Sequence, residues 1–293
     1  MPGLHWLDLD DPLSSALDNL AVRYGFHELA IEDCRNRLQL AKVDYYDDHS
    51  FIIINTTHYT ELPCEVKLRE INLFIGADYI VTVHFGHSRA IEEIEKKLAT
   101  KAVHFTRPDM VLHVIIDLVV DRYLPTLDHM GETIDKVQDE ILIDPTPSHL
   151  ETMFDLKRGL LQFRRAVSSQ RELVNTLIRD ETDFIHSDMR IYFRDVYDHT
   201  VRAMDMVETY RDLLTGGLDI YLTQMANRTN DIVKALTILA TLMLPLTLIT
   251  GYFGMNFEYI PFMRDHYGIW YVTIVLVIIS LGMLVWFKYK KWI

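Results

Sequence analysis

Two long apolar runs lie close together near the C-terminal end of the chain. The first, Ile232 to Phe253, carries a single charge, Lys234, and the second, Trp270 to Phe287, carries none. Each run is about the length that a helix needs to cross the hydrocarbon layer of a membrane, roughly 20 residues. The pattern therefore predicts a helical hairpin through a membrane. Its segments are a first span at 232–253, an outer loop at 254–268, a second span at 269–287 and a basic tail at 288–293.

Strand and helix patterns alternate over residues 1–125, ahead of the spans. Short β-rich runs bounded by turn residues indicate strands, and amphipathic runs between them indicate helices. The pattern predicts an α+β domain with a mainly antiparallel sheet, in which Gly76-Ala77-Asp78 forms a hairpin turn. The predicted strands are Trp6–Leu9, Phe51–Thr57, Glu65–Ile75 and Tyr79–Phe85, and the predicted helices are Pro12–Tyr24 and His87–Ala99.

Long helical patterns fill the middle of the chain. The first runs from about Asp109 to Arg179 and breaks at Asp144-Pro145-Thr146-Pro147, which predicts two antiparallel helices joined by a turn. From Glu181 to Phe253 the only proline is Pro245, so one helix of on the order of 100 Å could run into the membrane. The corresponding segments are a helical pair at 126–180 and a cytoplasmic stalk helix at 181–231.

A seven-residue repeat follows this long helix. Both repeat positions of a dry coiled coil are Leu, Ile or Val. Here the first position is Asp in four successive repeats of the stalk, and in the span both positions are mostly small or polar. Polar groups are costly in hydrocarbon, so the stripe should face a packed partner or water enclosed by several copies of the helix. Small-residue packing alone would not explain the four aspartates. The two positions read Asp198, Asp205, Asp212, Asp219, Ala226, Val233, Ala240, Thr247 and Arg202, Thr209, Gly216, Thr223, Asn230, Thr237, Leu244, Gly251.

Charge is distributed unevenly along the chain. The net charge is −13, and nearly all acids precede residue 232, which argues against nucleic acid as a partner and fits a body that attracts cations. One acidic helix face is either a solvated surface or a cation-attracting fringe: Asp128, Glu132, Asp135, Asp139 and Glu140. The two cysteines, Cys34 and Cys64, have no metal or redox spacing and are expected to be reduced thiols.

Basic residues flank the two spans on one side. Only Arg264 lies in the intervening loop, so the positive-inside rule predicts that both termini are cytoplasmic. The N-terminal segment is acidic and has no apolar core, so no cleaved signal is expected. The apolar run Val111–Val120 is interrupted by His113 and Asp117 and is too short to span. The flanking residues are Arg228, Lys234, Lys288, Lys290 and Lys291.

A tripeptide at the end of the first span carries the most specific signal. Gly254-Met255-Asn256 continues as Phe257-Glu258-Tyr259-Ile260-Pro261, and the upstream run Tyr192–Thr200 reads YFRDVYDHT. In this position between two terminal spans, these residues resemble the CorA family of divalent-cation channels. The resemblance implies a funnel-shaped homo-oligomer, a pentamer, in the inner (plasma) membrane of a prokaryote. It would contact membrane lipid and pass Mg²⁺, and also Co²⁺ or Ni²⁺, with no small-molecule substrate.

The resemblance also assigns roles along the pore. Gly254, Met255 and Asn256 would form the selectivity filter, where neutral oxygens accept hydrogen bonds from the waters of a hydrated Mg²⁺ ion. A helix C-terminal cap is the alternative role of Asn256. Val233 and Leu244 would form a gate that closes by dewetting, and Glu258 lies in the outer loop. The expected pore-lining residues are Asp219, Thr223, Asn230, Val233, Thr237, Ala240, Leu244, Thr247 and Gly251.

Cytoplasmic Mg²⁺ is expected to act as a regulatory ion as well as the transported one. The resemblance places Asp195 at a regulatory site completed by a carboxylate of a neighbouring subunit's α+β domain, and an ordinary salt bridge to an arginine is the alternative. Two other functions remain open: a zinc transporter of the same fold, and a membrane-anchored sensor that conducts no ion. No enzyme activity is expected, because neither a nucleophile motif nor a phosphate-binding loop is present.

Overall fold

The computed structural model describes residues 4–37, 39–60, 65–100, 105–180, 184–255, 260 and 266–292. The chain divides into two units, Met1–Tyr221 and Leu222–Ile293. The first unit holds the sheet and most of the helices, and the second holds the two apolar helical segments near the C-terminus. The two units are described separately below.

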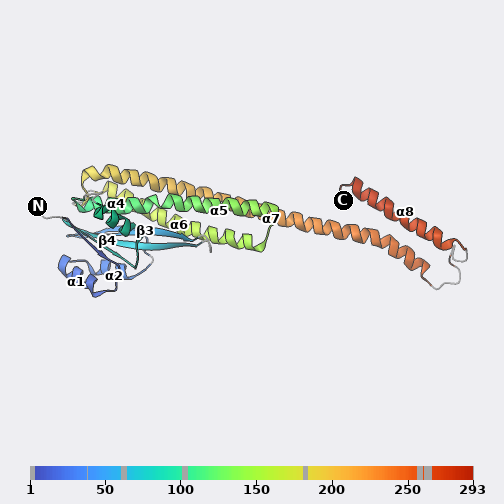
Figure 1. Ribbon diagram of the computed structural model, residues 1–293, viewed down its shortest axis with the longest axis horizontal. Helices are drawn as coiled ribbons and strands as arrows, with labels where there is room; N and C mark the ends of the chain where they lie inside the picture. The colour runs from blue at the N-terminus through green and yellow to red at the C-terminus, as the bar shows by residue number, and fades with distance from the viewer. Residues whose placement is uncertain are drawn as a thin grey trace. The chain divides into compact units, whose positions relative to one another are not determined.

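Five strands form one mixed sheet in the first unit (Figure 1). Their order is β1-β5-β4-β3-β2, with β1 parallel to β5 and the other neighbours antiparallel. This confirms the predicted mainly antiparallel sheet. The strands are β1 (His5–Leu9), β2 (Lys42–Tyr45), β3 (Ser50–Thr60), β4 (Glu65–Ile75) and β5 (Tyr79–His84).

The predicted hairpin turn between β4 and β5 is also present. The backbone N–H of Gly76 donates to the carbonyl of Tyr79 at 3.0 Å, which closes the turn. A Cβ at Gly76 would collide with the Tyr79 ring, so a residue with a side chain there would displace the ring.

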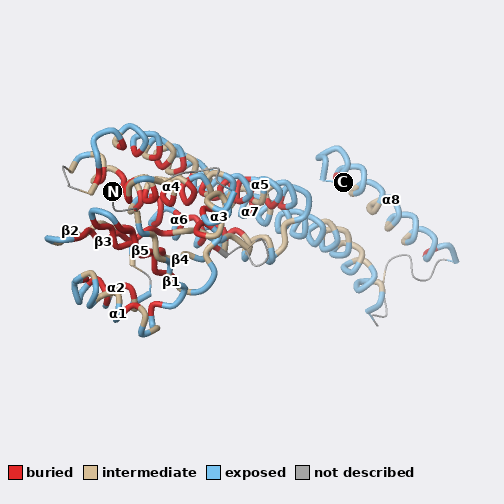
Figure 2. Tube along the Cα trace, turned by 60° about the vertical axis from the view of Figure 1, so that its left-hand side comes forward, coloured by how far each residue is buried: buried red, intermediate tan, exposed pale blue. Residues whose placement is uncertain are grey.

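Both faces of the sheet are buried, which explains the continuous apolar runs in its strands. In β3, Phe51 and Ile53 belong to one hydrophobic cluster, and Ile52 and Ile54 belong to the other. Side chains that alternate between two covered faces must all be apolar. Figure 2 shows the buried strands between two helical layers.

Two short helices cover the first face: α1 (Ser15–Tyr24) and α2 (Glu28–Arg35). Helix α1 begins three residues later than the predicted start at Pro12. The sequence did not predict α2 or β2. Helix α2 has only eight residues and β2 only four, so neither is long enough for its periodicity to stand out.

The second face is covered by longer helices, α4 (Pro108–Asp121), α5 (Tyr123–Ile143) and α6 (Pro147–Arg179), while α3 (Arg89–Ala99) packs on α4. The expectation of one helix from Asp109 to the turn at 144–147 was wrong, because the structure divides it at Arg122. Pro125 has no N–H to bond the carbonyl of Asp121, and its ring crowds that carbonyl.

A polar contact is enclosed in the core between α5 and the sheet. The Tyr123 side chain is fully buried, and its Oη donates to the carbonyl of Asn55 in β3 at 2.5 Å. This bond fixes the first turn of α5 against the sheet, since a buried hydroxyl without a partner would be costly.

A single helix, α7 (Arg190–Phe253), follows a short 3-10 turn at Ser187–Met189 and continues through Pro245. The last helix is α8 (Gly268–Tyr289). By length and composition, α7 and α8 each contain a segment able to cross a membrane. The predicted fold class is confirmed: an α+β N-terminal domain, a long helix and two apolar C-terminal helices.

Candidate pore stripe and metal site

The predicted polar stripe lies on an exposed face of α7, as judged from the residues that the structure describes. Every residue at the two repeat positions is exposed, from Asp198 to Gly251. Within the first unit, the opposite face of the same helix is packed into the core. Its buried residues are Phe193, Val196, Thr200, Ala203, Val207, Leu214, Gly217 and Tyr221. The acidic half of the stripe is therefore available for contact with water or with another copy of the chain.

The apolar half of α7 has a shallow groove along the same stripe. Its volume is about 900 Å³, and its lining includes Ala240, Leu244, Thr247 and Gly251 of the repeat. The two predicted gate residues have largely free side chains, with exposed fractions of 54% for Val233 and 73% for Leu244. Large apolar side chains this exposed need a membrane or a partner to cover them.

Two threonines of the stripe, Thr237 and Thr247, differ in the hydrogen bonding of their hydroxyl groups. Thr237 Oγ1 donates to the carbonyl of Val233 at 2.7 Å, so this hydroxyl is occupied within the helix. No hydrogen bond of the Thr247 hydroxyl is found among the residues that the structure describes. Thr247 is therefore the better placed of the two to offer an oxygen to a hydrated ion.

Helix α7 ends just before the predicted filter. The N–H of Gly254 still donates to the carbonyl of Thr250 at 2.9 Å, and the N–H of Met255 donates to Tyr252 at 3.4 Å. The chain leaves the helix at this point. Asn256 of the predicted filter, Glu258 of the predicted outer loop and Arg264 lie outside the described residues.

Helices α4 and α7 bring a group of metal-ligating side chains together. One ligand atom from each of Asp117, Asp121 and His199 lies within 4.8 Å of the others. His199 Nδ1 is 3.0 Å from Asp121 Oδ1. Burial raises the pKa of Asp117, and the nearby carboxylate of Asp121 raises it further. Two carboxylates that repel one another beside an imidazole provide a donor set that suits a divalent cation.

Asp195, the predicted regulatory residue, lies one helical turn before His199 on α7 and is exposed. Its negative charge also contributes to the raised pKa of Asp117. Burial lowers the pKa of His113, also on α4, and this favours its neutral form. Asp195 was assigned a metal-binding role from the sequence, whereas Asp117, Asp121 and His199 were not.

The sequence does contain a pattern that could have pointed to two of these metal-ligating residues. Asp117 and Asp121 are four positions apart in the largely apolar helix α4, so they share one face of it. The sequence could not show that this face meets α7, because Asp121 and His199 are 78 positions apart.

Comparison with known proteins settles the family. A family model described as CorA-like Mg²⁺ transporter protein matches residues 2–291. The chain belongs to the CorA family. As a member of this transporter family with two apolar helices, it is an integral membrane protein.

CorA relatives from bacteria and archaea are similar over nearly the whole chain. The chain is 34% identical to the cobalt/magnesium transport protein CorA of Thermotoga maritima, over 92% of this chain and 78% of the relative. It is 30% identical to the putative metal ion transporter YfjQ of Bacillus subtilis, over 98% and 89%. The solved CorA magnesium transporter of Methanocaldococcus jannaschii matches with a TM-score of 0.87 and 26% identity, over 98% of this chain and 91% of that one.

Proposed function

We propose that several copies of this chain assemble around their α7 helices and form a channel for the passive transport of Mg²⁺. The observation that carries the proposal is the exposed stripe on α7, which is acidic in the stalk and small or hydroxylated in the span. The names of its relatives, which transport cobalt and magnesium, favour the same ions here. Co²⁺ and Ni²⁺ are further candidate cargoes, and a pentamer is the assembly that we expect.

The acidic half of the stripe would concentrate cations at the cytoplasmic end of the channel. Asp198, Asp205, Asp212 and Asp219 recur every seven residues and are exposed. Repeated in each copy around one axis, these carboxylates would create a strongly negative potential there. The basic residues at the cytoplasmic ends of the spans support an orientation with both termini inside.

The filter would recognise the hydrated ion. Mg²⁺ gives up its water reluctantly, so oxygens that accept hydrogen bonds from its first water shell can select it without dehydration. The Asn256 amide and the carbonyl of Gly254 offer such neutral oxygens. A ring of carboxylates would bind the ion more tightly and slow its release.

A gate at Val233 and Leu244 would close the channel by excluding water. Rings of exposed aliphatic side chains can make a narrow passage too apolar for a hydrated ion. Both residues lie on the stripe, about three helical turns apart.

Internal Mg²⁺ would regulate the channel at the Asp195 site. An ion bridging Asp195 with a carboxylate of a neighbouring subunit's α+β domain would stabilise one arrangement of the stalk, and loss of the ion would shift the population to another. Asp195→Ala should make uptake insensitive to internal Mg²⁺, with Asp128→Ala, an exposed carboxylate on α5, as the matched control. Unchanged sensitivity in Asp195→Ala would refute the regulatory role.

Mg²⁺ uptake into proteoliposomes tests the filter. Asn256→Ala should abolish most of the uptake, and Asn19→Ala, which removes the same amide from an exposed position on α1, should not. Equal uptake by Asn256→Ala and the wild-type chain would refute the filter assignment. Zinc uptake that exceeds Mg²⁺ uptake would favour the zinc transporter, and no flux of either ion would favour the sensor.

A further inference from the structure

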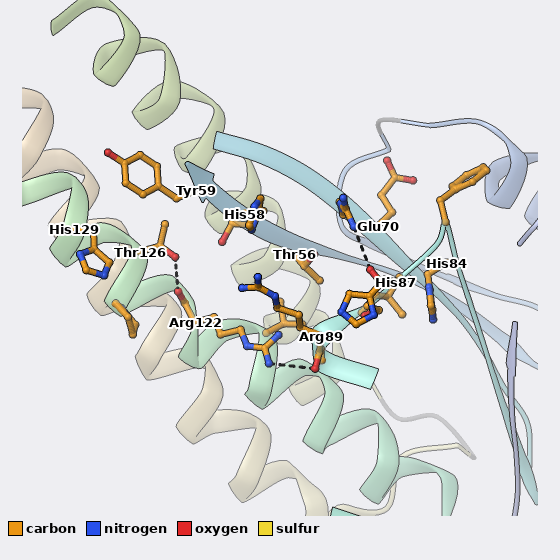
Figure 3. Close-up of a pocket in the computed structure, with 18 residues that line it drawn as sticks. Thr56, His58, Tyr59, Glu70, His84, His87, Arg89, Arg122, Thr126 and His129 are labelled. Atoms are coloured by element: carbon orange, nitrogen blue, oxygen red, sulfur yellow. Dashed lines mark hydrogen bonds between the residues drawn. The ribbon is translucent and has the colours of Figure 1, made fainter. Parts of the chain in front are cut away.

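A pocket in the α+β domain has no part in the proposed ion pathway. Its volume is about 620 Å³, which is in the range of small-molecule sites (Figure 3). Its walls are the second half of β3, the middle of β4, the end of β5, the first turn of α3 and the junction of α4 with α5.

The pocket is basic, although the chain as a whole carries a net charge of −13. Only one acidic residue, Glu70, is among the described residues that line it, and Glu70 Oε1 accepts a hydrogen bond from the Gln39 N–H at 2.6 Å. A positive concavity in an acidic protein concentrates small anions. Its basic lining residues are Arg69, Arg89, Arg122, His58, His84, His87 and His129.

The arginines keep most of their donors available. Arg122 Nη2 donates to Glu93 Oε2 at 2.8 Å and to the carbonyl of Arg89 at 3.3 Å. Arg69 Nη1 donates to the carbonyl of His87 at 3.1 Å. The Arg89 guanidinium has no ion pair within the described residues. Each guanidinium carries five N–H donors, so an oxyanion could be bound bidentately.

The start of helix α3 adds donors to the same space. Ser88, its N-cap residue, makes no side-chain capping bond, and Ser88, Arg89 and Ala90 line the pocket. The free N–H groups and the dipole of an eleven-residue helix favour an anion at this end. The nearby carboxylates of α3 are engaged, because Glu92 pairs with His87 at 2.9 Å and Glu93 with Arg122.

One further atom in the lining lacks a partner. Thr57 Oγ1 is buried and makes no hydrogen bond to any described residue. Buried hydroxyls in folded proteins nearly always have a partner, so a ligand at this site would satisfy it. Figure 3 shows Arg122 next to Arg89, whose carbonyl accepts a hydrogen bond from Arg122 Nη2, with His58, His87 and His129 among the other residues of the lining.

We propose that this pocket binds a phosphorylated metabolite of about the size of a mononucleotide. Phosphate oxygens match the guanidinium forks and the uncapped helix end, and a free phosphate would fill only a small part of the volume. The rings of His58, Tyr59 and His129 also line the pocket, and their faces can pack against a nucleobase.

The pocket and the candidate metal site both use residues at the C-terminal end of α4. Arg122, in its wall, directly follows Asp121, whose carboxylate contacts His199 of α7. A ligand held by Arg122 would therefore contact the helical region that also carries Asp121.

Isothermal titration of the full-length chain in detergent tests the proposal. The probes are AMP, ATP, inorganic pyrophosphate and glycerol 3-phosphate, all with a chelator present so that ion binding at the metal site does not contribute. AMP and ATP should bind more tightly than pyrophosphate. Arg89→Ala should weaken ATP binding about tenfold to a hundredfold, as expected for one or two charge-assisted hydrogen bonds.

Arg165→Ala is the matched control, because Arg165 is exposed on α6 and lies outside the pocket. It should leave the affinity unchanged, and an unaltered melting temperature of both variants would show that they fold. Absence of ATP binding by the wild-type chain, or equal weakening by the two variants, would overturn the proposal. Tighter binding of glycerol 3-phosphate than of AMP would overturn the nucleotide-size assignment and favour a lipid head group.

Discussion

Two adjacent glycines on α7 test which face of the stalk helix is packed and which is open. A Cβ at Gly217 would lie 2.6 Å from Met153 Cε and 2.9 Å from Gln138 Nε2. A Cβ at Gly216, which belongs to the polar stripe, would have no atom within 4 Å. Alanine at these two positions therefore probes a packed face and an open face of one helix.

The expected difference follows from two opposing effects. Alanine is favoured over glycine in a helix by about 1 kcal/mol, and both variants gain this. At Gly217 the added methyl group overpacks the contact with α5 and α6, which costs about 1–3 kcal/mol. It also disturbs the bond from Gln138 Nε2 to the carbonyl of Leu213, at 2.7 Å. Gly216→Ala should therefore be more stable than Gly217→Ala by about 1–3 kcal/mol.

Thermal unfolding of the full-length chain in detergent, followed by far-UV circular dichroism, measures this difference. It corresponds to roughly 2–12 °C in Tm. In a water-filled funnel the Gly216 position stays uncrowded in the assembly too, so its alanine is tolerated. If Gly216→Ala proves as destabilising as Gly217→Ala, the stripe is tightly packed between copies. That result would refute the open channel and favour the non-conducting sensor.

Three further predictions follow from single contacts. Leu244→Ser should wet the proposed gate and raise Mg²⁺ uptake into proteoliposomes at high internal Mg²⁺, and an unchanged rate would count against the gate. Tyr123→Phe removes the buried bond to Asn55, so the free energy of unfolding in urea should fall by about 1–2 kcal/mol, whereas no loss would mean that the bond is not formed. Burial acts to lower the pKa of His84, but its hydrogen bond to Asp8 and the charge of that carboxylate raise the pKa overall. Its stabilising contribution should therefore be complete below about pH 6.5 and fade as the pH rises through the raised pKa, so His84→Gln should flatten the pH dependence of Tm.

The elements that the sequence predicted well are those with a long, regular pattern. Strand β4 was predicted at Glu65–Ile75 and occupies those residues. Helix α2 and strand β2 were missed because they contain only eight and four residues. The division at Arg122 was missed for a different reason. One proline in an apolar, helix-like run shifts a boundary without interrupting the hydrophobic period.

Some functional features could likewise be predicted from the sequence, and others could not. The stripe on α7 could be found from the sequence because its residues repeat along one helix. The group of Asp117, Asp121 and His199 depends on how α4 packs against α7, and no local pattern encodes that contact. The basic pocket draws its residues from several elements, so it becomes visible only once the sheet and its helices are assembled.

The spacing of the stripe also constrains how copies of α7 could meet. A straight α-helix drifts by about 20° per seven residues relative to an exact heptad, so the seven repeats from Asp198 to Thr247 would rotate by about 140°. Straight, parallel helices could therefore not keep both Asp198 and Thr247 facing the central axis of the assembly. The copies would have to wind around each other in a left-handed supercoil. A change in the supercoil would then change the diameter of the helix bundle.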